Sequence, residues 1–159
     1  MLAAVVVNGR VVGKHTYGVG AVEWGLSVWA HKMRMWDHAT GQWRDTLGNP
    51  VSAPTISTRA HAGTIAEIRE ATINGNIVVS FKSGHGYRSA HGWGPTGLSK
   101  DQIEQAILQH LSVYLAAGGS VTPAGSGFSS FSTSVRGHTV NYRAVQLASG
   151  EIQVSTYYP

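Results

Sequence analysis

Residues 77–115 read IVVSFKSGHGYRSAHGWGPTGLSKDQIEQAILQHLSVYL and predict a strand, a loop and a helix in succession. The first six residues are rich in β-branched and aromatic side chains, which favour a strand. Ser99 and Gln102 form the Ser-x-x-Gln pattern typical of a helix capping box, and Gly118-Gly119 ends the helix. The apolar residues that recur at helical spacing are Ile103, Ile107, Leu111, Tyr114 and Leu115.

The loop in the middle of this stretch carries the residues best suited to chemistry. His85, Arg88 and His91 follow one another at three-residue steps among five glycines. Glycine lets a backbone approach a ligand closely. Two imidazoles and a guanidinium can perform acid–base chemistry on a phosphate without a metal ion. The alternative is a polar surface loop with incidental histidines, but the strand and the helix on either side would hold these residues in place.

The composition limits the class of protein. The chain has 159 residues, 42% of them hydrophobic, which is enough for one core, and it has no apolar run long enough to span a membrane. Cysteine is absent, which excludes disulfides, thiolate metal sites and cysteine nucleophiles. The formal net charge is +4, which favours an anionic partner such as nucleic acid or an acidic protein.

Toward the N-terminus, the sequence predicts an appendage over residues 1–50. Residues 3–12, AAVVVNGRVV, predict a hairpin around Asn8-Gly9, and apolar residues at three- and four-residue steps predict an amphipathic helix over 22–36. Turn residues then favour a domain boundary near residue 50, so that a second domain covers 51–159. Within it, TIAEIREATI at 64–73 predicts a short helix.

Toward the C-terminus, the sequence predicts a strand meander over 128–135, 139–147 and 151–158. Arg136-Gly137 and Ser149-Gly150 form the turns, and strands joined by tight turns pair antiparallel. The predicted fold is therefore α+β. Helices pack on a C-terminal antiparallel sheet of about four strands, and the hairpin and helix of residues 1–50 form an appendage.

Five short segments of the second domain carry a resemblance to a known group of proteins. The resemblance is carried by HGYRSAH at 85–91, GLS at 97–99, IEQAI at 103–107, YRAV at 142–145 and TYYP at 156–159. These segments are similar to the C-terminal ribonuclease domains of polymorphic toxins and contact-dependent inhibition systems, the barnase/EndoU/colicin/RelE-like group. The resemblance implies helices on a twisted four-stranded sheet that binds RNA on its face.

The same resemblance implies an activity, a location and a partner. The activity is metal-independent cleavage of RNA, with tRNA as one candidate substrate, in which the 2′-OH attacks its own phosphate and leaves a 2′,3′-cyclic phosphate. The location is bacterial, with secretion or delivery into the cytoplasm of a target cell. The partners are RNA and an acidic immunity protein.

Metal-free RNA cleavage needs a base, an acid and groups that stabilise the charged phosphorane. Imidazole titrates near neutral pH, so two histidines can supply the base and the acid, while arginine grips phosphate in bidentate fashion. Residues two apart on the last strand share a face and can donate hydrogen bonds. The predicted catalytic residues are His85, Arg88, His91, Thr156 and Tyr158; the predicted substrate-binding residues are Tyr87 and Trp93, which would stack on bases, and Arg143.

Each of these roles has an alternative. Arg143 can instead pair with Glu151 across the last hairpin, and Thr156 can be an ordinary strand residue. A metal site is disfavoured because His85 and His91 lack an H-E-x-x-H pattern or a carboxylate cluster, so neither a metal nor another cofactor is expected. The non-enzymatic alternative is a structural or assembly protein of a phage or secretion apparatus. Its contact surface would include Trp24, Trp29, Trp36 and Trp43.

Overall fold

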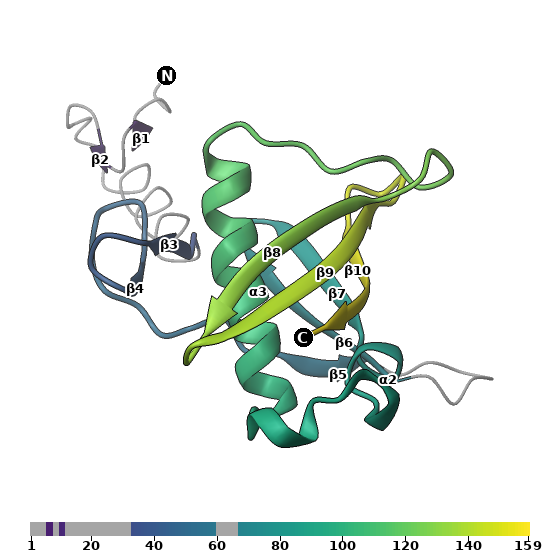
Figure 1. Cartoon of the computed structure of the whole chain (residues 1–159). Coiled ribbons are helices and arrows are strands. Elements are labelled where there is room, and N and C mark those ends of the chain that lie inside the picture. Colours follow the sequence, from purple (N-terminus) through teal and green to yellow (C-terminus); the bar gives the residue numbers. More distant parts are fainter. Residues whose placement is uncertain (1–5, 8–9, 12–32, 60–66) are drawn as a thin grey trace.

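The computed structural model describes residues 6–7, 10–11, 33–59 and 67–159, and its fold is α+β. One long helix packs on a six-stranded sheet whose strand order is β5-β6-β7-β10-β9-β8 (Figure 1). Neighbouring strands pair antiparallel, except for β7 and β10, which are parallel. The strands of this sheet are β5 (Ser57–Arg59), β6 (Ile68–Ile73), β7 (Ile77–Lys82), β8 (Ser129–Val135), β9 (His138–Gln146) and β10 (Ile152–Tyr158).

The long helix, α3 (Lys100–Ala116), begins at the predicted capping box. The Gln102 backbone N–H donates to Ser99 Oγ at 3.1 Å, and the Ser99 N–H donates to Gln102 Oε1 at 2.8 Å. Gly118, with a φ of 93°, follows its C-terminal end. No helix in the described part of the chain is long and apolar enough to cross a membrane.

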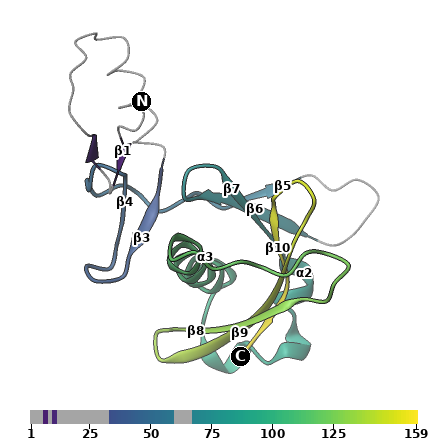
Figure 2. The ribbon, with the colours of Figure 1, turned by 90° about the horizontal axis from the view of Figure 1, so that it is seen from above.

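The sheet curves around α3, which Figure 2 shows end-on in the hollow of the strands. The face of the sheet toward α3 and the buried stripe of α3 form the core, whose side chains are almost completely withdrawn from solvent. Its largest fully buried hydrophobic side chains are Tyr142, Tyr157, Phe81, Ile73, Ile103, Ile107, Leu108, Leu111 and Ile152. The predicted stripe is thus confirmed at its three buried positions.

The prediction of about four antiparallel strands is wrong, because the helix predicted over 64–73 is a strand from Ile68 to Ile73. Asn74 and Gly75 follow this strand directly, have φ angles of 51° and 96°, and turn the chain into β7. Ile73 then pairs with Ile77, and this hairpin adds β5 and β6 to the sheet. The isoleucines of residues 64–73 are spaced as in a helix, but pairing with β7 makes residues 68–73 a strand. Residues 60–66 lie outside the described part.

The sheet is mixed because α3 connects β7 to the C-terminal strands. Ile152 of β10 lies opposite Val79 of β7 in parallel register. Parallel strands need a long crossover connection, and between β7 and β10 it consists of the histidine loop, α3 and the β8–β9 hairpin. The meander itself, β8 to β10, is antiparallel as predicted.

Only part of the predicted appendage is described. β1 (Val6–Val7) and β2 (Arg10–Val11) pair antiparallel. Residues 12–32, which include most of the helix predicted over 22–36, lie outside the described part. The end of that predicted helix is instead a strand, β3 (Met35–Asp37), paired with β4 (Gln42–Arg44). The rings of Trp36 and Trp43 meet edge to face at 5.5 Å across this pair, and Trp43 joins the core. Aromatic pairing across the hairpin explains why the helical spacing failed here.

Candidate functional site

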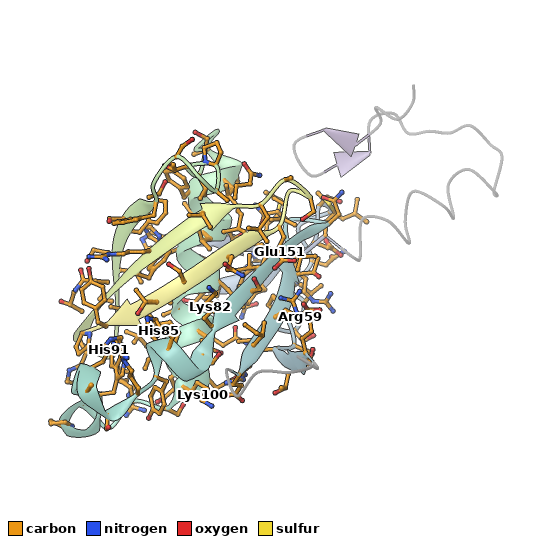
Figure 3. All side chains as sticks on the ribbon, turned by 90° about the vertical axis from the view of Figure 1, so that its right-hand side faces the viewer. Arg59, Lys82, His85, His91, Lys100 and Glu151 are labelled. Carbon is orange, nitrogen blue, oxygen red and sulfur yellow. The ribbon has the colours of Figure 1, made fainter. Side chains whose placement is uncertain are left out.

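The loop from β7 to α3 folds back against the end of β10. It contains α2 (Ser83–Gly86) and two 3-10 turns, Ser89–His91 and Gly94–Thr96. Gly86 touches the ring of Tyr157 so closely that a Cβ atom there would lie 2.6 Å from it. Only glycine permits this approach, which brings the histidine loop over the last strand. Figure 3 shows His85, His91 and Lys82 gathered at this end of β10, away from Arg59 and Glu151.

His91 is held in one orientation by two carbonyl groups. Its Nδ1 lies 2.8 Å from the carbonyl oxygen of Gly86 and 2.9 Å from that of Tyr157. Because both oxygens can only accept, Nδ1 must carry the proton. Nε2 lies 3.2 Å from Nε of Arg88, which donates to it. The ring is therefore a neutral imidazole whose Nε2 lone pair points toward Arg88.

His85 lies exposed beside this pair, with its ring centroid 6.4 Å from that of His91. Its pKa is lowered from the usual histidine value, first by partial desolvation, then by the positive charge of Arg88, by that of His91 whenever the His91 ring is protonated, and by that of Lys82. A lower pKa keeps the imidazole neutral and able to accept a proton over a wider pH range.

The end of the last strand completes the same surface. The Tyr158 ring lies 6.2 Å from the His91 ring, and the Arg143 guanidinium lies 5.8 Å from Tyr158 and 4.6 Å from Phe128. Thr156 pairs with Arg143 across the β9–β10 ladder and shares its face of the sheet. The predicted catalytic residues thus lie on one face, although they come from two distant segments. We call His85, Arg88, His91 and Tyr158 the surface site.

Arg143 does not take the alternative role considered from the sequence. Glu151 forms an ion pair with Arg59 and accepts a hydrogen bond from Ser80 Oγ at 2.6 Å. Arg143 stacks instead between the rings of Phe128 and Tyr158.

The structure contradicts the stacking role predicted for Trp93. Only 2% of this residue is exposed, its indole N–H donates to the Gly86 carbonyl at 3.0 Å, and its ring lies 6.0 Å from that of Tyr157. A ring enclosed in the core has no free face for a base, so Trp93 supports the loop. Tyr87 is half-buried, and its hydroxyl donates to the Leu98 carbonyl at 2.7 Å. It lines a hollow of about 400 Å³ beside Arg88.

The positive charges at and beside the surface site have no acidic partner among the described residues. Every acidic side chain in the described part takes up an ion pair or hydrogen bonds elsewhere. Lys82, Arg88 and Arg143 form no ion pair with any described carboxylate. A cluster of unpaired cations next to two histidines favours an anionic ligand.

The sequence interpretation missed Lys82 and Phe128. Lys82 ends β7 with Phe81 in the core, so strand alternation alone predicts that its side chain lies on the opposite face. Phe128 stands just before β8 in a glycine- and serine-rich connection and is 49% exposed. An aromatic residue isolated in a polar loop was the available signal.

A second polar cluster lies directly beneath the loop. Glu104 of α3 is fully buried, and its Oε2 accepts from Ser83 Oγ and from the Tyr157 hydroxyl, each at 2.6 Å. Its Oε1 lies 3.1 Å from Nη1 of Arg69 in an ion pair without hydrogen-bond geometry. Burial raises the pKa of Glu104, and burial together with Glu104 raises the pKa of Tyr157. We call Ser83, Glu104, Tyr157 and Arg69 the buried junction, because it joins α2, α3, β6 and β10.

Two further findings bear on the site. Within the described residues, no three or more histidine, aspartate or glutamate side chains gather to hold a metal ion. No protein-family model matches the chain, and comparisons with the curated proteins and with the solved structures gave no match. The geometry of the surface site therefore carries the functional argument.

Proposed function

We propose that the protein is a metal-independent endoribonuclease that cleaves RNA by 2′-OH transesterification at the surface site. The observation that carries the proposal is the convergence of two histidines and an arginine on one exposed surface. The His85 and His91 rings are 6.4 Å apart, and Arg88 contacts His91. Rings this close can each form a hydrogen bond of about 2.9 Å to a different oxygen of one phosphodiester.

His85 is the general base. Its lowered pKa leaves the imidazole neutral, so it accepts the proton of the 2′-OH. The 2′-oxygen attacks phosphorus, the new P–O2′ bond closes the cyclic phosphate, and the P–O5′ bond breaks. Lys82, whose charge contributes to the low pKa, also lies close enough to offset the charge of the phosphate.

His91 is the general acid that protonates the leaving 5′-oxygen. Its Nδ1 is fixed on two carbonyl groups, so Nε2 is the nitrogen that exchanges the proton. In the free protein, Arg88 donates to this nitrogen. An incoming phosphate competes for the guanidinium and can engage it with two hydrogen bonds. Nε2 is then released and takes up a proton from water before cleavage.

The test is incubation of the purified protein with total bacterial RNA, followed by analysis of the product ends. We expect 2′,3′-cyclic phosphate and 5′-OH ends, both with and without EDTA. His85→Ala should lower the rate about 10²–10⁴-fold, the usual contribution of a general base. Because His85 is exposed, the Tm of this variant should not change.

Arg88→Lys provides a second arm with a matched control. A lysine keeps the charge but cannot reproduce the bidentate grip, so cleavage should fall. Arg136→Lys, in the turn between β8 and β9, should leave cleavage unchanged. Full cleavage by a folded His85→Ala, His91→Ala double variant would place the active site elsewhere. If the wild type cleaves no RNA, or cleaves only with an added metal, the proposal is wrong.

A further inference from the structure

The surface site continues into a row of aromatic and guanidinium planes. Phe128, Arg143 and Tyr158 lie one beside the next, with the guanidinium 4.6 Å from the Phe128 ring and 5.8 Å from the Tyr158 ring. Tyr158 in turn lies 6.2 Å from His91. We call Phe128, Arg143 and Tyr158 the stacking platform. It leads directly to the proposed general acid.

We propose that the stacking platform binds an unpaired nucleobase, so that the site takes single-stranded RNA with a base next to the cleaved phosphate stacked on Phe128. The reference to cleavage rests on the proposed function, whereas the binding of single-stranded RNA does not. The sequence predicted base stacking at Tyr87 and Trp93, substrate binding by Arg143 and catalysis by Tyr158, but it predicted no role for Phe128.

Phe128 is unusual among the large hydrophobic side chains because much of its ring is exposed to solvent. Large hydrophobic side chains in the described part are mostly buried, and the two that are clearly exposed are Phe128, at 49%, and Val113, at 39%. Val113 lies on α3, whereas Phe128 shares the outer face of the sheet with Arg143, since Ser130 pairs with Arg143 two residues further on. An exposed ring beside an unpaired guanidinium offers one free face for a flat ligand.

The neighbouring charges indicate that this flat ligand is attached to a polyanion. Arg143, Arg88 and Lys82 form no ion pair with a described carboxylate. A nucleic acid supplies phosphates for the cations and π-faces for the platform at the same time. Proteins that bind single strands combine these two features: a positive surface that tracks the backbone and aromatic side chains on which bases stack.

The platform also favours a single strand over a duplex. Bases in an A-form helix are stacked on one another and present only their edges, so their faces cannot reach a side chain. An unpaired base can lie on Phe128 while its phosphate approaches Arg88 and the histidines. A duplex would contact the cations through its phosphates but could not stack a base on Phe128.

The experiment measures binding separately from cleavage. The His85→Ala, His91→Ala double variant serves as the background, so that the probe survives. The probe is a short fluorescein-labelled RNA of mixed sequence, used as a single strand and annealed to its complement, with fluorescence anisotropy as the readout. We expect Phe128→Ala to weaken single-strand binding roughly tenfold, as is typical for the loss of one stacked base. Phe128→Trp should retain binding, and Phe128→Leu, which keeps apolar area without a π-face, should not.

Val113→Ala is the matched control, because it also truncates an exposed hydrophobic side chain but lies on α3. It should leave binding unchanged, and duplex binding should be weak and independent of Phe128. If Phe128→Ala binds the single strand as tightly as its background, or if Leu and Trp at this position behave alike, the platform is not a stacking site. If the background binds through Phe128 but the wild type cleaves nothing, the proposed function is wrong while the platform stands.

Discussion

The surface site and the buried junction lie on opposite faces of α2 and β10. Among the described residues, charged groups are paired in the buried junction, whereas at the surface site they are not. Tyr157 points into the buried junction, and Tyr158, the next residue, belongs to the surface site. Ser83 of α2 donates to Glu104 inside the molecule, whereas His85 of the same helix is exposed. In the junction a carboxylate is matched by Arg69 and by two hydroxyl donors. At and beside the surface site, Lys82, Arg88 and Arg143 form no ion pair with any carboxylate in the described part of the chain.

This difference distinguishes residues that stabilise the fold from residues that are available to bind a ligand. A buried charge is tolerated only when it is paired and hydrogen-bonded, so the junction must be complete before the protein is stable. Unpaired cations at a surface remain solvated and cost little, but they attract anions. Stability and activity should therefore respond to different substitutions, even at adjacent positions.

The largest effect on stability is expected at the centre of the buried junction. Glu104→Ala leaves the Ser83 and Tyr157 hydroxyls without their acceptor, whereas Arg69 keeps its ion pair with Asp101. Each buried donor left without a partner costs about 1–3 kcal/mol, so the loss should exceed that of any single hydroxyl deletion. Denaturant unfolding measures the loss. The control is Glu67→Ala, which removes a half-exposed ion pair with Lys100 and should cost about 1 kcal/mol or less. Equal losses in the two variants would show that the junction does not stabilise the fold.

The adjacent tyrosines give the sharpest test of the comparison. Tyr157→Phe removes one donor from Glu104 and should lower the free energy of unfolding by about 1–3 kcal/mol. Tyr158→Phe makes the same chemical change on the other face, where it should alter stability by about 0.5 kcal/mol at most. Cleavage by Tyr158→Phe should fall if its hydroxyl stabilises the phosphorane. The Tm and the cleavage rate are measured in both variants. A larger loss of stability in Tyr158→Phe than in Tyr157→Phe would overturn the assignment of the two faces.

The smallest expected effect is a shift in the pH dependence of cleavage. His85 must be unprotonated to act as the base, so kcat/KM should rise with pH as it loses its proton. Because the pKa of His85 is lowered, the midpoint of this rise in kcat/KM should lie at a pH below 6.5, the ordinary histidine value. Lys82→Gln removes one of the charges that lower this pKa and should move the rise to higher pH. Lys100→Gln is the control, because Lys100 is paired with Glu67, and it should leave the pH midpoint unchanged. If Lys82→Gln has the same pH profile as the wild type, Lys82 does not influence the pKa of His85.

The central stretch was predictable because its signals are local. The β-branched run of β7 and the Ser99–Gln102 box each act within a few residues, and both were located correctly from sequence. The meander was also visible, since tight turns separate its alternating strands. Grouping His85, Arg88 and His91 required only their closeness in one loop.

Other features depended on partners distant in sequence. Residues 68–73 carry an ambiguous pattern of isoleucines, and only pairing with β7 makes them a strand. Trp93 sits in a loop that looks exposed, but the fold encloses its ring against Tyr157. Whether an aromatic residue in a loop binds a base or fills the core is decided by what packs on it.

By itself, the sequence determined the strand–loop–helix unit, the C-terminal meander and the residue types able to act on a phosphate. Only the tertiary structure decided that β10 lies beside β7 in parallel, which brings Tyr158 and Arg143 to the histidine loop. It also decided that Glu104 is buried and Phe128 exposed. The physical reason is that turns and caps depend on neighbours along the chain, whereas burial and charge pairing depend on neighbours in space, which the pairing of strands sets for the chain as a whole.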